Sequence, residues 1–128
     1  MAEWTNEELR KIEVAEELTI ASMRGDGTFR KPVTIWVVRR GDQLYVRSVN
    51  GPQGAWFRGT QTRQLGRIRA GGVTKDVTFV SVDPADEVGN EVDAAYRAKY
   101  RRYPASIVNA VLTAQARAAT LELVPNNQ

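Results

Sequence analysis

The sequence of 128 residues contains no cysteine and no histidine. Without cysteine the chain can form no disulfide, but a chain of this length can bury a hydrophobic core large enough to fold without one. Without histidine it lacks the commonest metal ligand and the usual general base at neutral pH. These two absences argue against a zinc hydrolase and against Ser-His or Cys-His nucleophilic catalysis.

Long hydrophobic runs are also missing, since none approaches the roughly 20 residues of a transmembrane helix. The first nine residues, MAEWTNEEL, are acidic where a secretory signal would be basic and then apolar. We therefore expect a cytoplasmic protein without a membrane segment. The absence of repeats and low-complexity linkers, together with 42% apolar and 26% charged residues, predicts one globular domain over residues 1–128.

The formal net charge of +3 is distributed unevenly along the chain. Residues 24–75 carry eleven Arg or Lys and only two acids, Asp26 and Asp42, whereas residues 1–23 and 76–128 are both net acidic. A basic middle of this kind favours an anionic partner, either a phosphorylated small molecule or a nucleic acid. A solvated basic face is the alternative that the charge pattern leaves open.

Hydrophobic periodicity predicts a helix followed by a series of strands. Thr5 and Glu8 have the spacing of a capping box, which predicts a helix over residues 6–15 within an N-terminal segment of residues 1–17. Alternation with period two and glycine-containing turns predict the main strands within residues 18–82. These strands are expected at residues 18–23, 29–38, 43–49, 66–70 and 73–82.

The second strand, residues 29–38, has a β-branched run that predicts burial on both faces, while Pro32 predicts that its first part lies at an edge or bulge. Helical spacing follows within residues 83–117, where Pro104 separates two helices, and residues 118–124 alternate as a last strand. About six strands and two or three helices favour a mainly β fold, a small closed or nearly closed antiparallel β-barrel with peripheral helices.

The candidate binding residues lie in the basic middle of the chain. A strand that ends in Arg47 and Ser48 would bring a cation and a hydroxyl to the rim of the sheet, and the glycine-rich loop that follows would let backbone N–H groups approach an anion. Arg58 could complete a phosphate clamp. Trp36 and Trp56 offer planar apolar surface for a ring system. A purely structural role is the alternative for each of these residues.

Other common binding motifs are missing. The sequence contains no P-loop and no GxGxxG segment between a strand and a helix. Asp83, Asp86 and Glu87 are close together, but their position before a helix is better explained by capping than by a metal site. We therefore expect no metal.

The chain contains, in order, the motifs LTIAS, GDGT, PVTIWVV, GDQLYVRSV, WFRG, AYRAKY and ATLELVP. In the order of these motifs it resembles a bacterial family of unknown function. That family is related to the FMN-binding split-barrel proteins, the group of pyridoxamine-phosphate-oxidase-like proteins and deazaflavin-dependent nitroreductases. The resemblance covers nearly the whole chain. It implies a split β-barrel, usually a homodimer with the cofactor at the subunit interface.

The resemblance also implies positions for an FMN or deazaflavin cofactor. The strand that contains Thr34 and Trp36 would border the ring, and Ser48 would contact the ribityl chain or the phosphate. This chain has Arg58-Gly59-Thr60 where the related proteins have Asn-Leu or Lys. The residues expected to hold the cofactor are Arg24, Lys31, Val33, Thr34, Trp36, Arg47, Ser48, Trp56 and Arg58. Tyr96 and Tyr100 are expected to close the substrate side.

Three functions are consistent with these observations. The first is a flavin- or deazaflavin-dependent oxidoreductase that transfers hydride to a small oxidised substrate such as a quinone or a nitro compound, with the cofactor supplying the chemistry. The second is a dimeric, non-enzymatic module that binds a flavin or another anionic ligand for storage or sensing. The third, nucleic-acid binding through the basic middle, is disfavoured because the sequence has neither a recognition-helix motif nor an RNP-like aromatic pattern.

Overall fold

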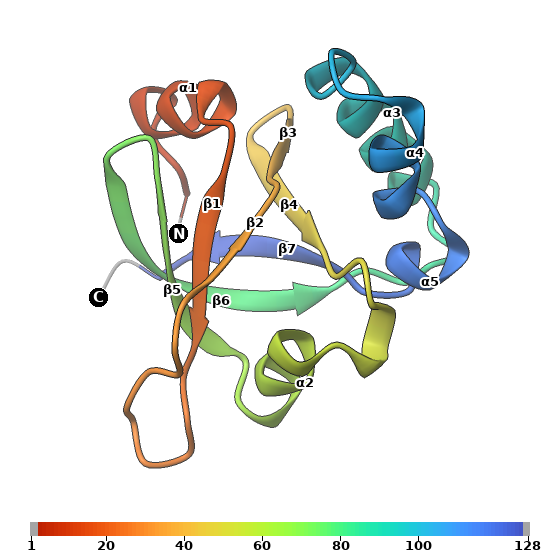
Figure 1. Cartoon of the computed structure of the whole chain (residues 1–128). Coiled ribbons are helices and arrows are strands. Elements are labelled where there is room, and N and C mark those ends of the chain that lie inside the picture. The colour runs from red at the N-terminus through yellow and green to blue at the C-terminus, as the bar shows by residue number, and fades with distance from the viewer. Residues whose placement is uncertain (1–2, 127–128) are drawn as a thin grey trace.

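Over residues 3–126 the fold is mainly β, with seven strands and several short helices (Figure 1). A computed structural model describes residues 3–126. The strands are β1 (Leu18–Ser22), β2 (Val33–Ile35), β3 (Val38–Arg40), β4 (Gln43–Arg47), β5 (Leu65–Ala70), β6 (Val73–Ser81) and β7 (Thr120–Pro125). The helices are α1 (Asn6–Val14), α2 (Ala55–Thr62), α3 (Val88–Lys99), α4 (Ala105–Val108) and α5 (Ala114–Arg117), with 3-10 turns η1 (Gly51–Gln53) and η2 (Asn109–Val111).

All seven strands belong to one antiparallel sheet, in the order β2-β1-β5-β6-β7-β4-β3. The two edge strands, β2 and β3, are separated in the chain only by Trp36 and Val37. A single segment therefore pairs with β1 at one edge and with β4 at the other, which is possible only if the sheet curls until its edges meet. This confirms the small antiparallel split barrel predicted from the sequence.

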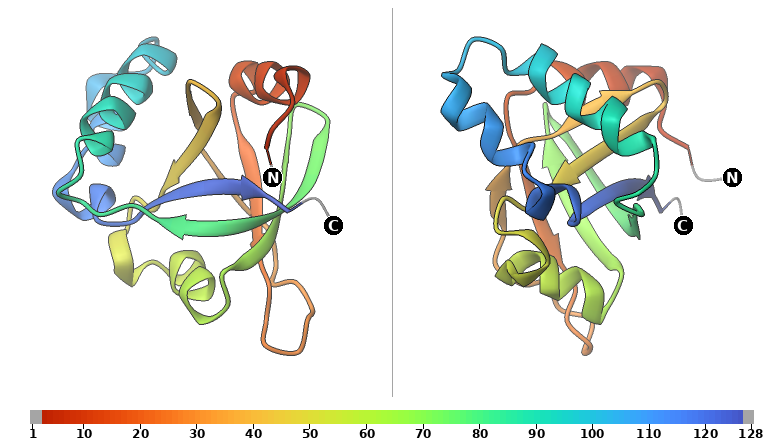
Figure 2. Two further views of the ribbon diagram at one scale, coloured as in Figure 1. Left: turned by 180° about the vertical axis from the view of Figure 1, so that it is seen from behind. Right: turned by 90° about the vertical axis from the view of Figure 1, so that its right-hand side faces the viewer.

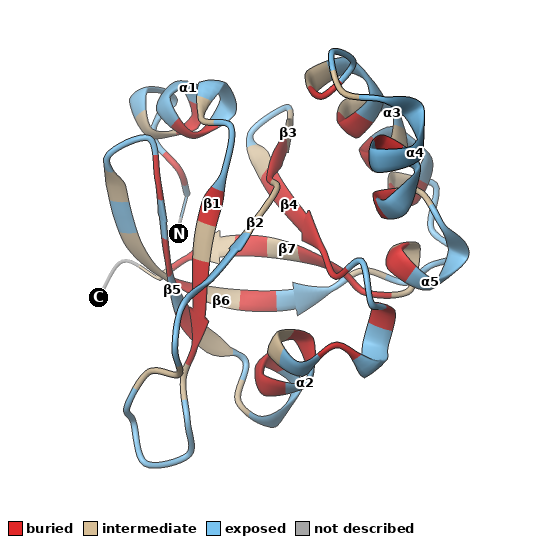
Figure 3. Ribbon diagram, in the orientation of Figure 1, coloured by how far each residue is buried: buried red, intermediate tan, exposed pale blue. Residues whose placement is uncertain are grey.

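The prediction of one continuous strand over residues 29–38, buried on both faces, is wrong. The segment divides into β2 and β3, and in β2 both Val33 and Thr34 are exposed (Figure 3). The backbone N–H of Val37 donates to the hydroxyl of Tyr100 at 3.3 Å instead of to a neighbouring strand. The break lies where the segment passes from one edge of the sheet to the other, and the exposed β2 agrees with the edge position that Pro32 predicted.

The second helix predicted within residues 83–117, after Pro104, is also divided in the structure. It consists of α4, η2 and α5, and the side chain of Thr113 accepts from Ala116 N to cap α5. Because the Thr113 side chain caps the start of a new helix, the helix before it ends, and the 3.6-residue hydrophobic spacing does not run on into α5. The structure thus has seven strands and more helices than the sequence predicted.

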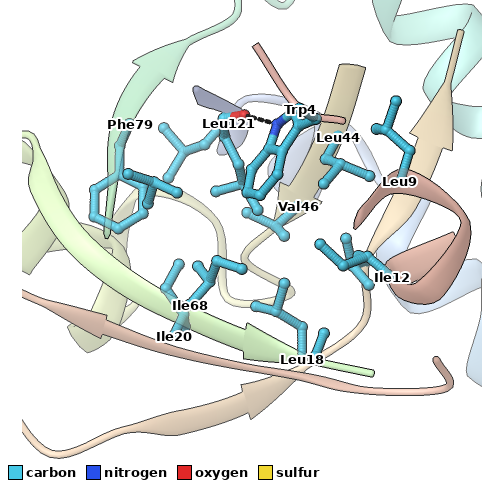
Figure 4. Close-up of a cluster of buried hydrophobic side chains, with 14 of the residues drawn as sticks. Trp4, Leu9, Ile12, Leu18, Ile20, Leu44, Val46, Ile68, Phe79 and Leu121 are labelled. Atoms are coloured by element: carbon cyan, nitrogen blue, oxygen red, sulfur yellow. Dashed lines mark hydrogen bonds between the residues drawn. The ribbon is translucent and has the colours of Figure 1, made fainter. Parts of the chain in front are cut away.

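The main hydrophobic core fills the barrel beneath α1 (Figure 4). The predicted capping box begins α1: Glu8 N donates to Thr5 Oγ1 at 3.1 Å, and Thr5 N donates to Glu8 Oε1 at 2.9 Å. Leu9 and Ile12, one turn apart on α1, are fully buried in this core. The core therefore joins the N-terminal helix to the inner face of the sheet.

A second hydrophobic core lies on the outer side of β3 and β4. Figure 2 shows α3, α4 and α5 together on one side of the barrel. Buried residues of this core come from two strands and from the helical segment, namely Val38, Tyr45, Val92, Tyr96, Tyr100, Val108 and Val111. None of the helices in the described part of the chain has the length and hydrophobicity that crossing a bilayer requires.

Candidate functional site

Two adjoining pockets lie on either side of Trp56, which lines both. The first, which we call the basic pocket, has a volume of about 270 Å³ and is lined by Ile20, Ser22, Arg24, Arg30, Lys31, Val33, Ala55 and Trp56. The second, the apolar pocket, has a volume of about 250 Å³ and is lined by Thr34, Ile35, Trp36, Arg47, Val49, Trp56, Ile107, Ala110 and Val111. Strand β2 contributes to both, through Val33 on one side and Thr34 on the other.

Two larger hollows are less suited to a phosphorylated ligand. One, of about 840 Å³, has four carboxylate residues in its wall and Arg40 as its single cation. The other, of about 700 Å³, covers the outer face of β1 and β5, where Arg67 is paired with Asp76 at 2.6 Å. Their charge and exposure leave the two smaller pockets as the candidate site for an anion and a ring.

The basic pocket holds three cations, and no carboxylate residue is among the described residues that line it. Arg30 Nη1 donates to the carbonyl oxygen of Met23 at 3.2 Å and to Ser22 Oγ at 3.5 Å. Arg24 Nη1 donates to the carbonyl oxygen of Phe29 at 2.8 Å, which holds it to its own loop. These contacts are to neutral acceptors; Asp26, in the same loop as Arg24, partly offsets the charge of Arg24 but does not line the pocket.

The start of α2 adds backbone donors to this positive region. Its N-cap, Gly54, provides no side-chain cap, and among residues 3–126 no acceptor is found for the N–H groups of Ala55, Trp56 and Phe57. Unpaired N–H groups at a helix start carry the positive end of the helix dipole and favour a bound anion. Ala55 and Trp56 are themselves part of the wall of the basic pocket.

Ser48 stands beside this helix start. Its Oγ is buried and has no hydrogen-bond partner among the described residues. A Cβ built on Gly54 would lie 2.4 Å from that Oγ, so the hydroxyl is packed directly against the N-cap of α2. Because buried hydroxyls are nearly always hydrogen-bonded, a partner is expected for this one, although Ser48 itself lines neither pocket.

The apolar pocket has a rigid aromatic wall. The indole of Trp36 stacks on the phenol of Tyr100, with ring centroids 3.8 Å apart and 4° between the ring planes. Trp36 is half-buried and presents its remaining surface to the pocket. Val49 and Ile107 at the rim are 47% and 48% exposed, which makes the mouth of the pocket apolar as well.

The structure brings most of the predicted cofactor residues to these two pockets. The predicted residues that line them are Arg24, Lys31, Val33, Thr34, Trp36, Arg47 and Trp56. Ser48 lies next to them at the start of α2. Arg58 does not join them, because it lies on the exposed side of α2 and lines neither pocket.

Arg47 lies in the wall of the apolar pocket, but its guanidinium is turned into the protein. Its side chain is fully buried and forms an ion pair with Asp93. It also donates to Thr120 Oγ1 at 2.9 Å, to the carbonyl oxygen of Val111 at 2.9 Å and to that of Gly89 at 3.0 Å. The guanidinium of Arg47 therefore joins the barrel to the helical segment, and Arg47 does not line the basic pocket.

Tyr96 and Tyr100 are buried in the second core and line neither pocket. Burial raises the pKa of both phenols. The hydroxyl of Tyr100 donates to the carbonyl oxygen of Glu16 at 2.7 Å, and the ring supports Trp36 from behind. Tyr100 thus influences the pocket through Trp36, without facing a substrate itself.

Sequence reasoning missed several residues of the site. Arg30 and Ser22 line the basic pocket, and Ile107 and Val111 line the apolar pocket. Arg30 belongs to the basic middle of the chain, so the charge pattern was a signal for it. Ile107 and Val111 reach the pocket only because the helical segment folds back on the barrel, and no local pattern predicts that contact.

The fold is shared with solved structures of low sequence identity. The heme storage protein HutZ from Vibrio cholerae has a TM-score of 0.68 at 14% identity, and the match covers 95% of this chain and 88% of HutZ. An F420 reductase has a TM-score of 0.57 at 16% identity, covering 92% of each chain. A FAD-binding protein from Mesorhizobium loti has a TM-score of 0.55 at 14% identity, covering 97% and 91%.

Sequence comparison adds one clear assignment. No curated protein matches the sequence. A family model matches residues 8–123, which include every element of the barrel except the ends of α1 and β7. The chain therefore belongs to DUF2255, a family of uncharacterized proteins conserved in bacteria.

Proposed function

We propose that the chain binds a flavin-type cofactor, FMN or a deazaflavin, with the ring in the apolar pocket and the phosphate in the basic pocket. The observation that carries this proposal is the contact between the two pockets at Trp56. A carboxylate-free pocket with three cations adjoins a pocket walled by Trp36 and apolar side chains. Their volumes, about 270 and 250 Å³, together fall within the range of about 300 to 1,000 Å³ usual for cofactor sites.

The residues present fit the phosphate of such a cofactor. Arg30 and Lys31, and the free N–H groups at the start of α2, are donors of the kind that bind phosphate oxygens. They come from two separate segments of the chain, and the buried hydroxyl of Ser48 lies against the N-cap of α2. Their convergence at one end of the site supports a ligand with a negatively charged tail.

The proteins of similar fold support a ring-containing cofactor. One is an F420 reductase, one binds FAD, and HutZ stores heme. A heme would need an axial ligand, and the chain has no histidine or cysteine to provide one. No tyrosine or methionine, the other side chains that serve as axial ligands, is among the described residues that line either pocket. Flavin or deazaflavin is therefore favoured over heme.

The activity that we propose is hydride transfer to a small oxidised substrate, such as a quinone or a nitro compound. When bound, the cofactor supplies the redox chemistry. The protein would bind the phosphate, hold the ring plane against Trp36, which Tyr100 fixes by stacking, and keep water from the ring with apolar side chains. A module that stores or senses the same cofactor would use the same contacts. Steady-state turnover with a reduced cofactor and a quinone or nitro acceptor separates the two.

Binding of the cofactor is expected to quench tryptophan fluorescence, because two of the three tryptophans line the site. Titration of the protein with FMN or a deazaflavin should give saturable quenching. Trp56→Ala should weaken binding by about 1–3 kcal/mol, the range for an aromatic contact to a planar ligand, because it removes the wall shared by the two pockets. Trp4→Phe, in the barrel core, is the matched control and should bind normally. If neither cofactor binds at tens of micromolar, the proposal is refuted.

We also propose that the chain forms a homodimer that covers these pockets. Among the described residues, five large hydrophobic side chains are exposed, and three of them, Val33, Val49 and Ile107, line the basic or apolar pocket. Strand β2 beside them is an edge strand with an exposed face. An apolar rim around an open site is typical of a surface that a second subunit covers.

The protein is expected to elute at the mass of a dimer in size-exclusion chromatography with light scattering. Ile107→Glu should shift it to a monomer, because a charge would be buried in the interface without a partner. It should also weaken cofactor binding. Val80→Glu, at an exposed residue that lines neither pocket, is the control and should remain a dimer. A native protein that stays monomeric at tens of micromolar would contradict the proposal.

A further inference from the structure

Arg30 is the one cation of the basic pocket that is held between two elements of the barrel. It lies in the connection between β1 and β2, is half-buried, and packs against both β1 and α2. Its Nη1 donates to the carbonyl oxygen of Met23 at 3.2 Å and to Ser22 Oγ at 3.5 Å. Arg24, by contrast, is exposed and bonded within its own loop, and Lys31 is exposed. Arg30 is therefore the most precisely positioned charge at this end of the site.

The position of Arg30 depends on Gly59 in α2. A Cβ built on Gly59 would lie 2.5 Å from Ser22 Oγ and 3.3 Å from both Cδ and Nη1 of Arg30. The arginine side chain thus crosses α2 where the helix carries no side chain of its own. A glycine inside a helix costs about 1 kcal/mol relative to alanine, so its presence calls for a packing reason. Here that reason is the space taken by Ser22 and Arg30.

The charge of Arg30 is not cancelled by its contacts. Its two acceptors are a carbonyl and a hydroxyl, both neutral, and the described residues that line the basic pocket include no Asp or Glu. An arginine that is fixed in this way still has donors to offer, and guanidinium groups bind phosphate oxygens through paired hydrogen bonds. Arg30 is therefore a fixed cation with hydrogen-bond donors left to bind an anionic group.

We propose that Arg30 selects phosphorylated ligands over the same ligands without phosphate, and that Gly59 is its positioning residue. This inference rests on the proposed function for the identity of the ring and assigns the specificity of that same site. Gly59 touches no ligand in this proposal. It acts by leaving the space through which Arg30 reaches the basic pocket.

The test compares the affinities for FMN and riboflavin, which differ only by the phosphate, in the native protein and in variants. Arg30→Gln is expected to weaken FMN binding by about 10- to 150-fold, the equivalent of losing about 1.5–3 kcal/mol for hydrogen bonds to a charged group. Riboflavin binding should change by no more than about twofold to threefold, since it makes no phosphate contact. Arg101→Gln, exposed and beyond the end of α3, removes the same charge elsewhere and should leave both affinities unchanged.

The role of Gly59 is tested by a double-mutant cycle. Gly59→Ala should lower FMN affinity without lowering that of riboflavin, and the double variant Gly59→Ala/Arg30→Gln should resemble Arg30→Gln alone, because the glycine acts through the arginine. Thermal unfolding of each variant shows whether it is folded. If Gly59→Ala does not fold, the second test is Arg30→Lys, which keeps the charge but not the paired donors and should retain only part of the FMN preference.

The outcomes separate this inference from the proposed function. If the native protein prefers FMN and Arg30→Gln keeps the same preference, the inference is overturned while the cofactor proposal stands. It is also overturned if the native protein binds both flavins equally. If neither flavin binds, the cofactor proposal fails, and inorganic pyrophosphate becomes the probe for the basic pocket. The inference is supported if pyrophosphate raises the thermal unfolding temperature of the native protein but not that of Arg30→Gln. It is overturned if pyrophosphate stabilises both proteins equally or neither of them.

Discussion

Replacing Arg47 by alanine is expected to lower the free energy of unfolding by about 3–5 kcal/mol, the usual cost of removing one partner from a buried ion pair. The substitution would leave Asp93 with only the more distant Arg117, at 3.9 Å, as a cationic partner, and would remove the hydrogen bonds to Thr120, Val111 and Gly89. These groups belong to α3, η2 and β7, so one side chain joins the helical segment to the barrel. Chemical denaturation followed by circular dichroism measures the change.

The control for this prediction is Arg97→Ala, which removes an exposed arginine of α3 and should change stability by no more than about 0.5 kcal/mol. The sequence alone led to a different expectation, that Arg47 lies at the rim of the sheet and helps to hold the cofactor. That first interpretation would be restored if Arg47→Ala had the same denaturation midpoint as the native protein but a lower affinity for the cofactor.

Trp4→Ala is expected to destabilise the protein by a similar amount, about 3–5 kcal/mol, as large aromatic truncations in cores do. Trp4 is 7% exposed and lies in the barrel core with Leu44, Val46 and Leu121 (Figure 4). Its indole Nε1 donates to the carbonyl oxygen of Leu123 at 2.9 Å. The residue therefore fixes the segment before α1 to β7, near the other end of the chain.

Trp4→Phe separates packing from hydrogen bonding. It keeps an aromatic ring in the core and removes the bond to Leu123, so the expected loss is smaller, about 1 kcal/mol for the hydrogen bond plus the effect of the reduced volume. Val14→Ala, at a residue of α1 that is 76% exposed, should leave stability nearly unchanged. Equal denaturation midpoints for Trp4→Ala and the native protein would contradict the prediction and show that the packing of Trp4 contributes little to the free energy of unfolding.

The features that could be predicted from the sequence are those whose partners are close in the chain. The capping box needs only Thr5 and Glu8, and the hairpin of β5 and β6 needs only alternation on either side of Gly71 and Gly72. The basic middle of the chain likewise indicated where the cations of the site would come from. Glycines at 71 and 72 adopt φ of 56° and 84°, the left-handed region that makes such a turn favourable.

The site could be predicted only in part, because residue type does not show which way a side chain turns. Arg47 and Arg30 are both arginines of the basic region, yet one is buried against Asp93 and the other lines the basic pocket. The difference arises from what packs over each: α3 and η2 bring acceptors to Arg47, whereas Gly59 leaves α2 open for Arg30. Both neighbours are distant in sequence from the arginine concerned.

By itself, the amino-acid sequence determined the local turns, the helix start, the alternation of most strands and the uneven charge. The tertiary structure decided that β1 pairs with β5, that β7 lies between β6 and β4, and that the short link through Trp36 and Val37 closes the barrel. It also decided which cations face the site. These pairings depend on how much apolar surface is buried when segments far apart in the chain come together. The alternation of apolar and polar residues along one strand does not specify which other strand will pair with it.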